Sequence, residues 1–228
     1  SRSVENGFEG ILYAAIAGAN VINCSWGGSD YSNAEQEIIN QVIALDAVVV
    51  AAAGNDNLKG RFYPAAYDGV MSVAALARDD VRANYSNYYT GIDVSAPGNN
   101  CYSTIPPYNL YSYDTTFAAD SSIIKIDTTT KEVAFDAWSG TSMASPVAAG
   151  VTALVRKKFP DLTVSETIEW VKAACDNIDS LNEFYIGNLG RGRVNALKAL
   201  TQENPRACIL SEYEAHDDNG DGDFDKGE

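Results

Sequence analysis

One short stretch decides the fold: residues 139–150, which read SGTSMASPVAAG. Nearly every residue over 143–154 is apolar or small, and this composition predicts a helix that is covered all round, like the central helix of a large domain. Pro146 lacks an N–H and is tolerated in the first helical turn, so we expect the helix to begin close to Thr141 and Ser142. The Ser142 hydroxyl would then lie among unpaired backbone N–H groups, which favour negative charge such as the oxyanion of acyl transfer.

A serine at a helix start usually does no more than cap the helix. The whole string, however, resembles the nucleophile motif of the subtilases, the subtilisin-like serine peptidases, through GTSMASPVAAG. The resemblance implies that Ser142 is the nucleophile that becomes acylated. It also implies that the backbone N–H of Ser142 is one donor to the oxyanion.

The composition fits one globular domain followed by an acidic tail. The chain has 228 residues, 46% of them hydrophobic, so it can bury a substantial core. We expect a peptidase domain over residues 1–201 and an acidic linker over residues 202–228. The formal net charge of −15 argues against nucleic acid as a partner. The sequence has no run of about 18 apolar residues and no basic-then-apolar start, which argues against a membrane span or a signal peptide.

Helix and strand patterns alternate along the first part of the chain. Apolar residues recur at helical spacing over residues 8–16, and the apolar runs at 21–26 and 46–53 read as buried strands, with a second helix between them through Leu45. This order predicts a doubly wound α/β fold, with a mostly parallel sheet and helices on both faces. Ligands of such sheets bind beyond the carboxyl ends of the strands, where Ser142 is therefore expected.

Both expected strands end in segments that carry more of the resemblance. Residues 52–55, AAGN, resemble the subtilase oxyanion-hole segment, which implies that Asn55 donates its side-chain amide to the oxyanion. Residues 25–28, SWGG, resemble the segment that pairs with the substrate backbone and forms a wall of the primary specificity pocket. The residues assigned to substrate binding are Ser25, Trp26, Gly27, Ala53 and Gly54. By themselves, both segments would read as turns after strands.

Later segments extend the resemblance to about residue 201. Matches at 63–67, 95–98 and 190–196 make the covered part roughly the latter two-thirds of a family domain. The family places a tight turn at its next pocket loop, so we expect a cis peptide at Tyr63–Pro64. Thr163 and Glu166 have the spacing of a capping box at the start of a helix.

An insertion precedes the nucleophile motif. The 34 residues between Thr104 and Ser139 are more than the resemblance leads us to expect there. Within them, residues 123–127 and 132–136 predict a β-hairpin joined by residues 128–131. The hairpin either flanks the cleft or is a passive excursion of the surface.

Two members of the expected triad are not found. Family members carry the triad Asp and His in D-[ST]-G and H-G-T-H segments, before the point that corresponds to Ser1, and neither segment occurs here. The single histidine, His216, lies in the acidic tail and reads as a solvated surface residue rather than as the base. The strands of that earlier part would also be missing, which would leave a central strand edge unpaired. An N-terminal fragment, a second copy of this chain or a disordered segment could cover that edge.

The tail offers a metal site. Its residues match the twelve-position calcium loop, with glycine at position six. The expected ligands are Asp217, Asn219, Asp221, Asp223, Asp225 and Glu228. The alternative is a plain solvated acidic linker. The four cysteines show no zinc spacing, and a disulfide between Cys175 and Cys208 stays open.

Taken together, the sequence predicts a subtilisin-like serine endopeptidase from a secreted multidomain protein. Polypeptides would be its substrates, and the chemistry would need no cofactor, with calcium as a possible structural ion. This chain by itself would be inactive, because it lacks the triad Asp and His. The alternative is a non-catalytic interaction module that reuses the fold.

Overall fold

The computed structural model describes residues 6–117 and 123–202. Four parallel strands form the central sheet in the order β1 (Val21–Cys24), β2 (Val48–Ala52), β3 (Met71–Leu76) and β4 (Val94–Pro97). Among the described residues, no helix is both long and apolar enough to cross a lipid bilayer.

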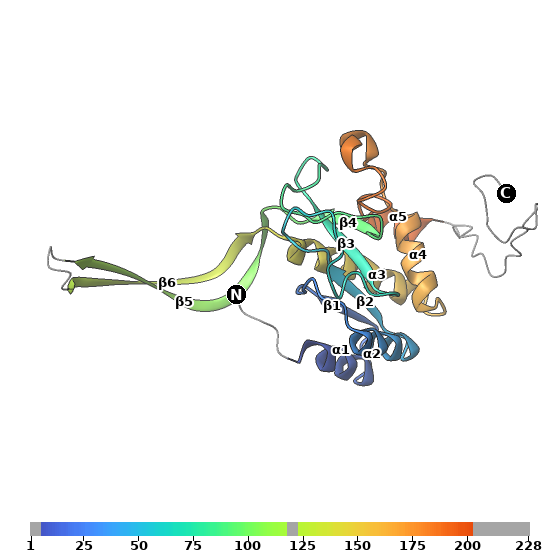
Figure 1. Ribbon diagram of the computed structural model, residues 1–228, viewed down its shortest axis with the longest axis horizontal. Coiled ribbons are helices and arrows are strands. Elements are labelled where there is room, and N and C mark those ends of the chain that lie inside the picture. Colours follow the sequence, from blue (N-terminus) through green and yellow to red (C-terminus); the bar gives the residue numbers. More distant parts are fainter. Residues whose placement is uncertain (1–5, 118–122, 203–228) are drawn as a thin grey trace, which may run out of the picture.

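Helices cover both faces of this sheet (Figure 1), as the sequence predicted. Side chains alternate along β2, so Val49 and Ala51 pack toward α1 (Gly7–Ile16) and α2 (Asn33–Ala44). Val48 and Val50 pack on the opposite face, in a cluster with apolar residues of three further helices. Those helices are α3 (Thr141–Lys158), α4 (Val164–Ala173) and α5 (Ala196–Thr201), and two 3-10 turns, η1 (Asp179–Leu181) and η2 (Glu183–Tyr185), lie between α4 and α5.

The two edges of the sheet differ. The outer side of β4 is covered by a loop, because the Ser95 N–H donates to the Gly192 carbonyl at 2.8 Å and the Val194 N–H donates to the Ser95 carbonyl at 2.9 Å. On the outer side of β1, no strand pairs within the part of the chain that the structure describes. The backbone groups of that edge are therefore available for another strand.

The prediction that α3 is covered all round is wrong. Val147 and Leu154 are 40% and 48% exposed, whereas the other side of the helix is buried against the sheet. Pro146 is also the sixth residue of α3 instead of lying in its first turn. A proline there leaves the Ser142 carbonyl without its intrahelical donor, and the Ser25 hydroxyl donates to that carbonyl at 2.8 Å instead.

The expected hairpin over residues 123–136 is also wrong. β6 (Ile123–Trp138) runs through residues 128–131 without a turn and pairs antiparallel with β5 (Cys101–Phe117). Threonines 128–130 are β-branched and favour the extended conformation, so they continue the strand. This long two-stranded arm projects away from the central sheet (Figure 1).

Two local predictions are confirmed. The Tyr63–Pro64 peptide is cis. Thr163 and Glu166 form the capping box of α4, in which the Thr163 hydroxyl accepts from the Glu166 N–H at 3.2 Å and the Glu166 carboxylate accepts from the Thr163 N–H at 2.8 Å.

The loop along β4 gives a stability prediction. Gly192 has φ +120°, and a Cβ on it would lie 2.0 Å from the Asp176 carbonyl oxygen. We expect Gly192→Ala to lower the free energy of unfolding by about 3 kcal/mol or more, because backbone strain and a collision add. Gly187→Ala is the matched control: φ is +74° and no atom lies within 4 Å of the added Cβ, so only the cost of the left-handed conformation, about 1–2 kcal/mol, is expected. Urea denaturation of both variants measures the difference, and equal losses would contradict the collision.

Candidate active site

Ser142 is the second residue of α3, two positions beyond the N-cap residue Gly140, so it does not cap the helix. Helix α3 begins beside the carboxyl ends of β1 and β2, as expected for a doubly wound sheet. Most N–H groups of its first turn already have acceptors, among them the Gly140 carbonyl and the Asn55 Oδ1, whereas within the described residues the Ser142 N–H has none and can donate to an anion. The hydroxyl of Ser142 is therefore held where negative charge is stabilised.

Ser142 and Ser25 are joined by reciprocal hydrogen bonds. The Ser142 Oγ donates to the Ser25 carbonyl at 2.9 Å, and the Ser25 Oγ donates to the Ser142 carbonyl at 2.8 Å. Asn23 supports this pair, because its Nδ2 donates to the Ser25 Oγ at 2.9 Å while its Oδ1 accepts from the Ser145 Oγ at 2.7 Å. The end of β1 and the start of α3 are thus fixed to each other through side chains.

Asn55 is held at the end of β2 by the residue before Ser142. Its Oδ1 accepts from the Thr141 N–H at 2.8 Å and from the Thr141 hydroxyl at 2.9 Å. The same hydroxyl accepts from the Gly54 N–H at 3.2 Å, and Thr141 is fully buried. Since the carbonyl end of the Asn55 amide is occupied, its NH₂ group is the end that can donate to an outside ligand.

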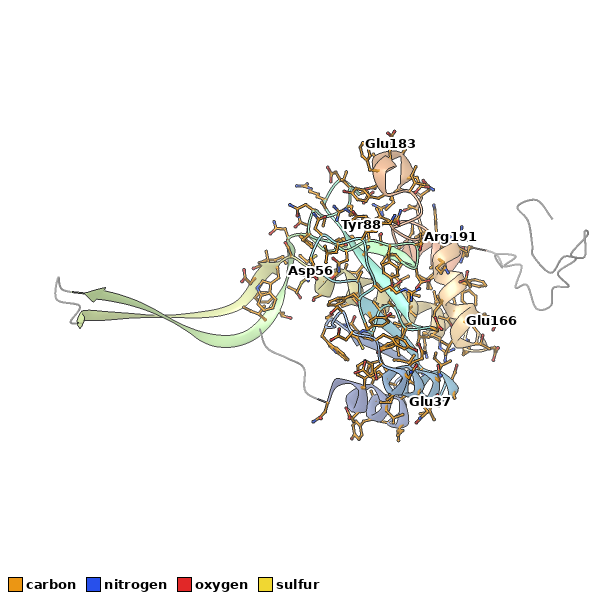
Figure 2. The ribbon with its side chains drawn as sticks, in the orientation of Figure 1. Glu37, Asp56, Tyr88, Glu166, Glu183 and Arg191 are labelled. Carbon is orange, nitrogen blue, oxygen red and sulfur yellow. The ribbon has the colours of Figure 1, made fainter. Side chains whose placement is uncertain are left out.

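The loop that carries Asn55 is held by hydrogen bonds from the side chains of Asn87 and Arg82. The Asn87 Oδ1 accepts from the Asp56 and Leu58 N–H groups at 3.0 and 3.1 Å. The buried Arg82 donates to the Asn57 Oδ1 at 2.8 Å, and its guanidinium lies 4.9 Å from the centre of the Tyr88 ring. Figure 2 labels Asp56 on the side of the molecule from which the β5–β6 arm projects.

The segment after β1 packs closely against the chain around Tyr63. Gly28 and Tyr63 exchange backbone hydrogen bonds of 2.8 and 2.7 Å, and a Cβ on Gly27 would lie 2.3 Å from the Tyr63 carbonyl oxygen. Trp26 packs edge-on against Phe8 of α1, with ring centroids 5.4 Å apart. A side chain larger than hydrogen is therefore excluded at Gly27.

The structure thus brings the candidate residues that follow β1 and β2 to the start of α3. It places no imidazole beside Ser142 within the described residues, because His216 lies outside them. The six calcium ligands expected in the tail and the Cys175–Cys208 pair also fall, in whole or in part, outside the described residues. Elsewhere, residues 6–117 and 123–202 contain no group of three or more His, Cys, Asp or Glu that could hold a metal.

Sequence reasoning missed Thr141 and Asn87. Thr141 stands inside the quoted motif, so its position beside Ser142 was visible, but its bonds to Asn55 join residues 86 positions apart. Nothing in the local sequence around Asn87 signals that its amide holds a loop some thirty residues earlier. Contacts of this kind follow from tertiary packing and leave no periodic pattern.

Comparisons with known proteins agree with this geometry. The model of the subtilase family matches residues 3–195. Among curated relatives, subtilisin DY of Bacillus licheniformis is 34% identical over 190 residues (82% of this chain, 58% of the relative), and thermitase of Thermoactinomyces vulgaris is 33% identical over 191 residues (84% and 57%). The cell wall-associated protease of Bacillus subtilis is 36% identical over 169 residues, which cover 74% of this chain and 16% of the relative.

Solved structures of proteases related to subtilisin have the same fold as this chain. A protease from Pseudoalteromonas arctica superposes with a TM-score of 0.66 at 32% identity, covering 85% of this chain and 57% of that one. Fervidolysin from Fervidobacterium pennivorans, a keratinolytic enzyme related to subtilisin, gives a TM-score of 0.67 at 29% identity, covering 87% and 29%. The chain spans little more than half the length of relatives such as subtilisin DY and thermitase.

Proposed function

Since the chain belongs to the subtilase family, whose matched members include subtilisin-type serine proteases, we propose that it carries the nucleophile and the oxyanion hole of a serine endopeptidase. One observation carries the proposal: Thr141 holds the Asn55 side-chain amide through two hydrogen bonds, and the next residue, Ser142, carries the hydroxyl. A polypeptide is the substrate, and the reaction is hydrolysis of a peptide bond through an acyl-enzyme.

The roles follow from the positions of the groups. The Ser142 Oγ attacks the scissile carbonyl carbon, and its proton passes to a histidine base. The carbonyl oxygen becomes an oxyanion, which accepts hydrogen bonds from the Ser142 N–H and from the Asn55 NH₂ group. The C–N bond then breaks as the base returns the proton to the leaving amine, and water releases the acyl group from Ser142 by the reverse sequence.

Substrate binding is assigned to the two strand ends. The backbone of Ser25, Trp26 and Gly27 would pair with the extended substrate on the acyl side of the bond, in the manner of strand addition. Ala53 is 0% exposed, so it would support the site from beneath Asn55 rather than touch the substrate, and Gly54 would lie between the two. A side chain is excluded at Gly54, because its φ is +101° and a Cβ would lie 2.3 Å from the Asn87 Nδ2.

The base and its aspartate are proposed to come from polypeptide upstream of Ser1. The unpaired edge of β1 and the exposed Val147 and Leu154 of α3 offer a place for additional strands and apolar side chains. A second copy of this chain could cover the same surface, but its only imidazole would again be His216. Upstream polypeptide is therefore the occupant that also accounts for the chemistry.

Calcium binding and secretion stay proposals. The tail loop from Asp217 to Glu228 is proposed to bind calcium on the pattern of its oxygen ligands. Secretion is proposed because a relative is a cell wall-associated protease. Neither property is needed for the chemistry at Ser142.

The proposal is tested by comparing this chain with a protein that also carries its natural upstream segment. With a quenched fluorescent peptide, we expect turnover only when the upstream segment is present, covalently or in trans. The chain alone should reach at most the residual rate that subtilisin retains without its triad, about 10³–10⁴ over water. Brisk turnover by the chain alone would contradict the assignment of the base. An inactive reconstituted domain would favour the interaction module.

A further inference from the structure

Arg82 is a buried cation that bonds to residues 54–58, the Asn55 loop. It is 8% exposed, and its guanidinium lies over two aromatic rings, 4.9 Å from the ring centre of Tyr88 and 4.3 Å from that of Tyr185. One terminal nitrogen donates to the Asn57 Oδ1 at 2.8 Å and to the Tyr185 hydroxyl at 2.9 Å. The side chain therefore joins the Asn55 loop to η2.

The acceptors of Arg82 are all neutral. Its other terminal nitrogen donates to the Ser86 carbonyl. Within residues 6–117 and 123–202, its Nε is buried without a hydrogen-bond partner and no carboxylate pairs with it. Burying a charge costs free energy that an ion pair would partly offset. Stability is therefore a weak reason for a cation at this position, whereas holding a functional loop is a direct one.

The Asn55 loop hangs on the chain segment that Arg82 begins. The Asn57 N–H donates to the Tyr85 carbonyl at 2.8 Å, and the Asn87 N–H donates to the Gly54 carbonyl at 2.9 Å. The bond from Arg82 adds a hold on the side chain of Asn57, two residues after Asn55. Asn57 itself has φ +55°, a conformation that asparagine and glycine adopt more readily than other residues.

The turn between α4 and α5 holds Arg82 from the other end. Asn182, the residue before η2, is 4% exposed, and its Oδ1 accepts from the Arg82 N–H at 2.8 Å. In Figure 2, Tyr88 is labelled between Asp56 of the loop and Glu183 of η2. Both the backbone and the guanidinium of Arg82 are thus bonded to this turn, so the position of its side chain is fixed before it reaches the loop.

We propose that Arg82 is a positioning residue for the oxyanion hole: through Asn57 it fixes the Asn55 loop, so that the Asn55 NH₂ group stays directed at the oxyanion. The inference rests on the proposed function, which gives that NH₂ group its role. Because the oxyanion exists only during the reaction, a donor that is less well placed lowers kcat and leaves KM nearly unchanged.

The first test measures turnover of the quenched peptide by the protein that includes the upstream segment. Arg82→Met keeps the length of the side chain and removes its donors. We expect kcat to fall about tenfold, a part of the 10²–10³-fold that the whole side-chain donor supplies in subtilisin, while KM changes by less than about twofold.

Arg156→Met is the matched control. Arg156 is 7% exposed and also donates to backbone, to the Leu162 and Asp46 carbonyls, but it lies near the C-terminal end of α3. Its loss should lower stability and leave kcat unchanged at a temperature where circular dichroism shows all variants folded. Equal losses of kcat in both methionine variants, or an unchanged kcat in Arg82→Met, would overturn the proposal.

Asn57→Gly tests the route and stands in for Arg82→Met if that variant does not fold. Glycine adopts the φ of +55° without strain, so the substitution removes the acceptor and leaves the backbone free to keep its course. We expect a loss in kcat of about tenfold, and no further loss when Arg82→Met is added, because both changes break the same hydrogen bond. A loss of about a hundredfold in the double variant would show that Arg82 does not act through Asn57.

Hydrogen exchange separates this inference from the proposed function, because it needs no catalysis. The Asp56 and Leu58 N–H groups, which donate to the Asn87 Oδ1, are followed in the same longer protein. Asn57→Gly should speed their exchange about tenfold, and Arg156→Met should not. If the parent cleaves no peptide, the proposed function fails while these rates still decide whether the bond holds the loop. If the parent cleaves the peptide and Asn57→Gly changes neither kcat nor exchange, the positioning role alone is wrong.

Discussion

Ser142→Ala is expected to abolish peptide hydrolysis by the protein that includes the upstream segment. The substitution removes the only atom that we assign to covalent bond formation and leaves the start of α3 in place. The expected loss in kcat is about 10⁶-fold, a magnitude taken from subtilisin, in which removing the nucleophile has that effect. Initial rates with the quenched peptide measure it.

The matched control for this variant is Ser165→Ala. Ser165 is an exposed serine in the first turn of α4, as Ser142 is in the first turn of α3. It lies in none of the segments assigned to the site, so its variant should keep the parent rate. A Ser142→Ala protein that stays folded by circular dichroism and cleaves at more than about a thousandth of the parent rate would show that the nucleophile lies elsewhere.

Asn55→Asp should lower kcat by about 10²–10³-fold and leave KM nearly unchanged. The magnitude is that of the side-chain oxyanion donor in subtilisin. The reason here is specific: aspartate keeps an oxygen that can accept from the Thr141 N–H and hydroxyl, so the loop stays held. What it loses is the NH₂ donor, and it adds a negative charge where the oxyanion forms. The effect should therefore appear in kcat, since that donor acts on the transition state.

Asn55→Leu separates donation from positioning. Leucine has a similar volume but neither donates to the oxyanion nor accepts from Thr141, so it should also lower the free energy of unfolding, by about 1–3 kcal/mol, because the buried Thr141 hydroxyl loses its acceptor. If both variants keep the parent kcat, Asn55 is only the turn residue that its local sequence suggests.

Much of the architecture could be predicted from the sequence because the relevant signals are local. The apolar run around β2 is closed by Gly54 and Asn55, and the parallel sheet then brings that end beside the helix that begins at Thr141. The cis peptide at Tyr63 and the capping box at Thr163 are likewise carried by a few neighbouring residues.

The errors share one physical cause, which is that the partner of a segment was not visible in its own sequence. Residues 123–136 alternate in a way that fits a hairpin, but their partner is the earlier strand β5, so the whole stretch became one strand. The apolar composition of α3 indicated burial on every side, yet Val147 and Leu154 face outward in this chain. Pro146 can lie in the second turn of α3 because the Ser25 hydroxyl donates to the Ser142 carbonyl, which the proline leaves without a donor. Ser25 is 117 residues away from Ser142 in the sequence, so the local pattern around Pro146 does not indicate this hydrogen bond.

The central claim is that Ser142 is a nucleophile activated by a base from upstream polypeptide, and labelling by a fluorophosphonate tests it most directly. The reagent is added to this chain and to the protein with its upstream segment, and the modified peptide is located by mass spectrometry. The account predicts one adduct, on Ser142, in the longer protein, and no adduct above background in the chain alone or in the longer Ser142→Ala variant. An adduct on another residue, or equally fast labelling of Ser142 without the upstream segment, would contradict it.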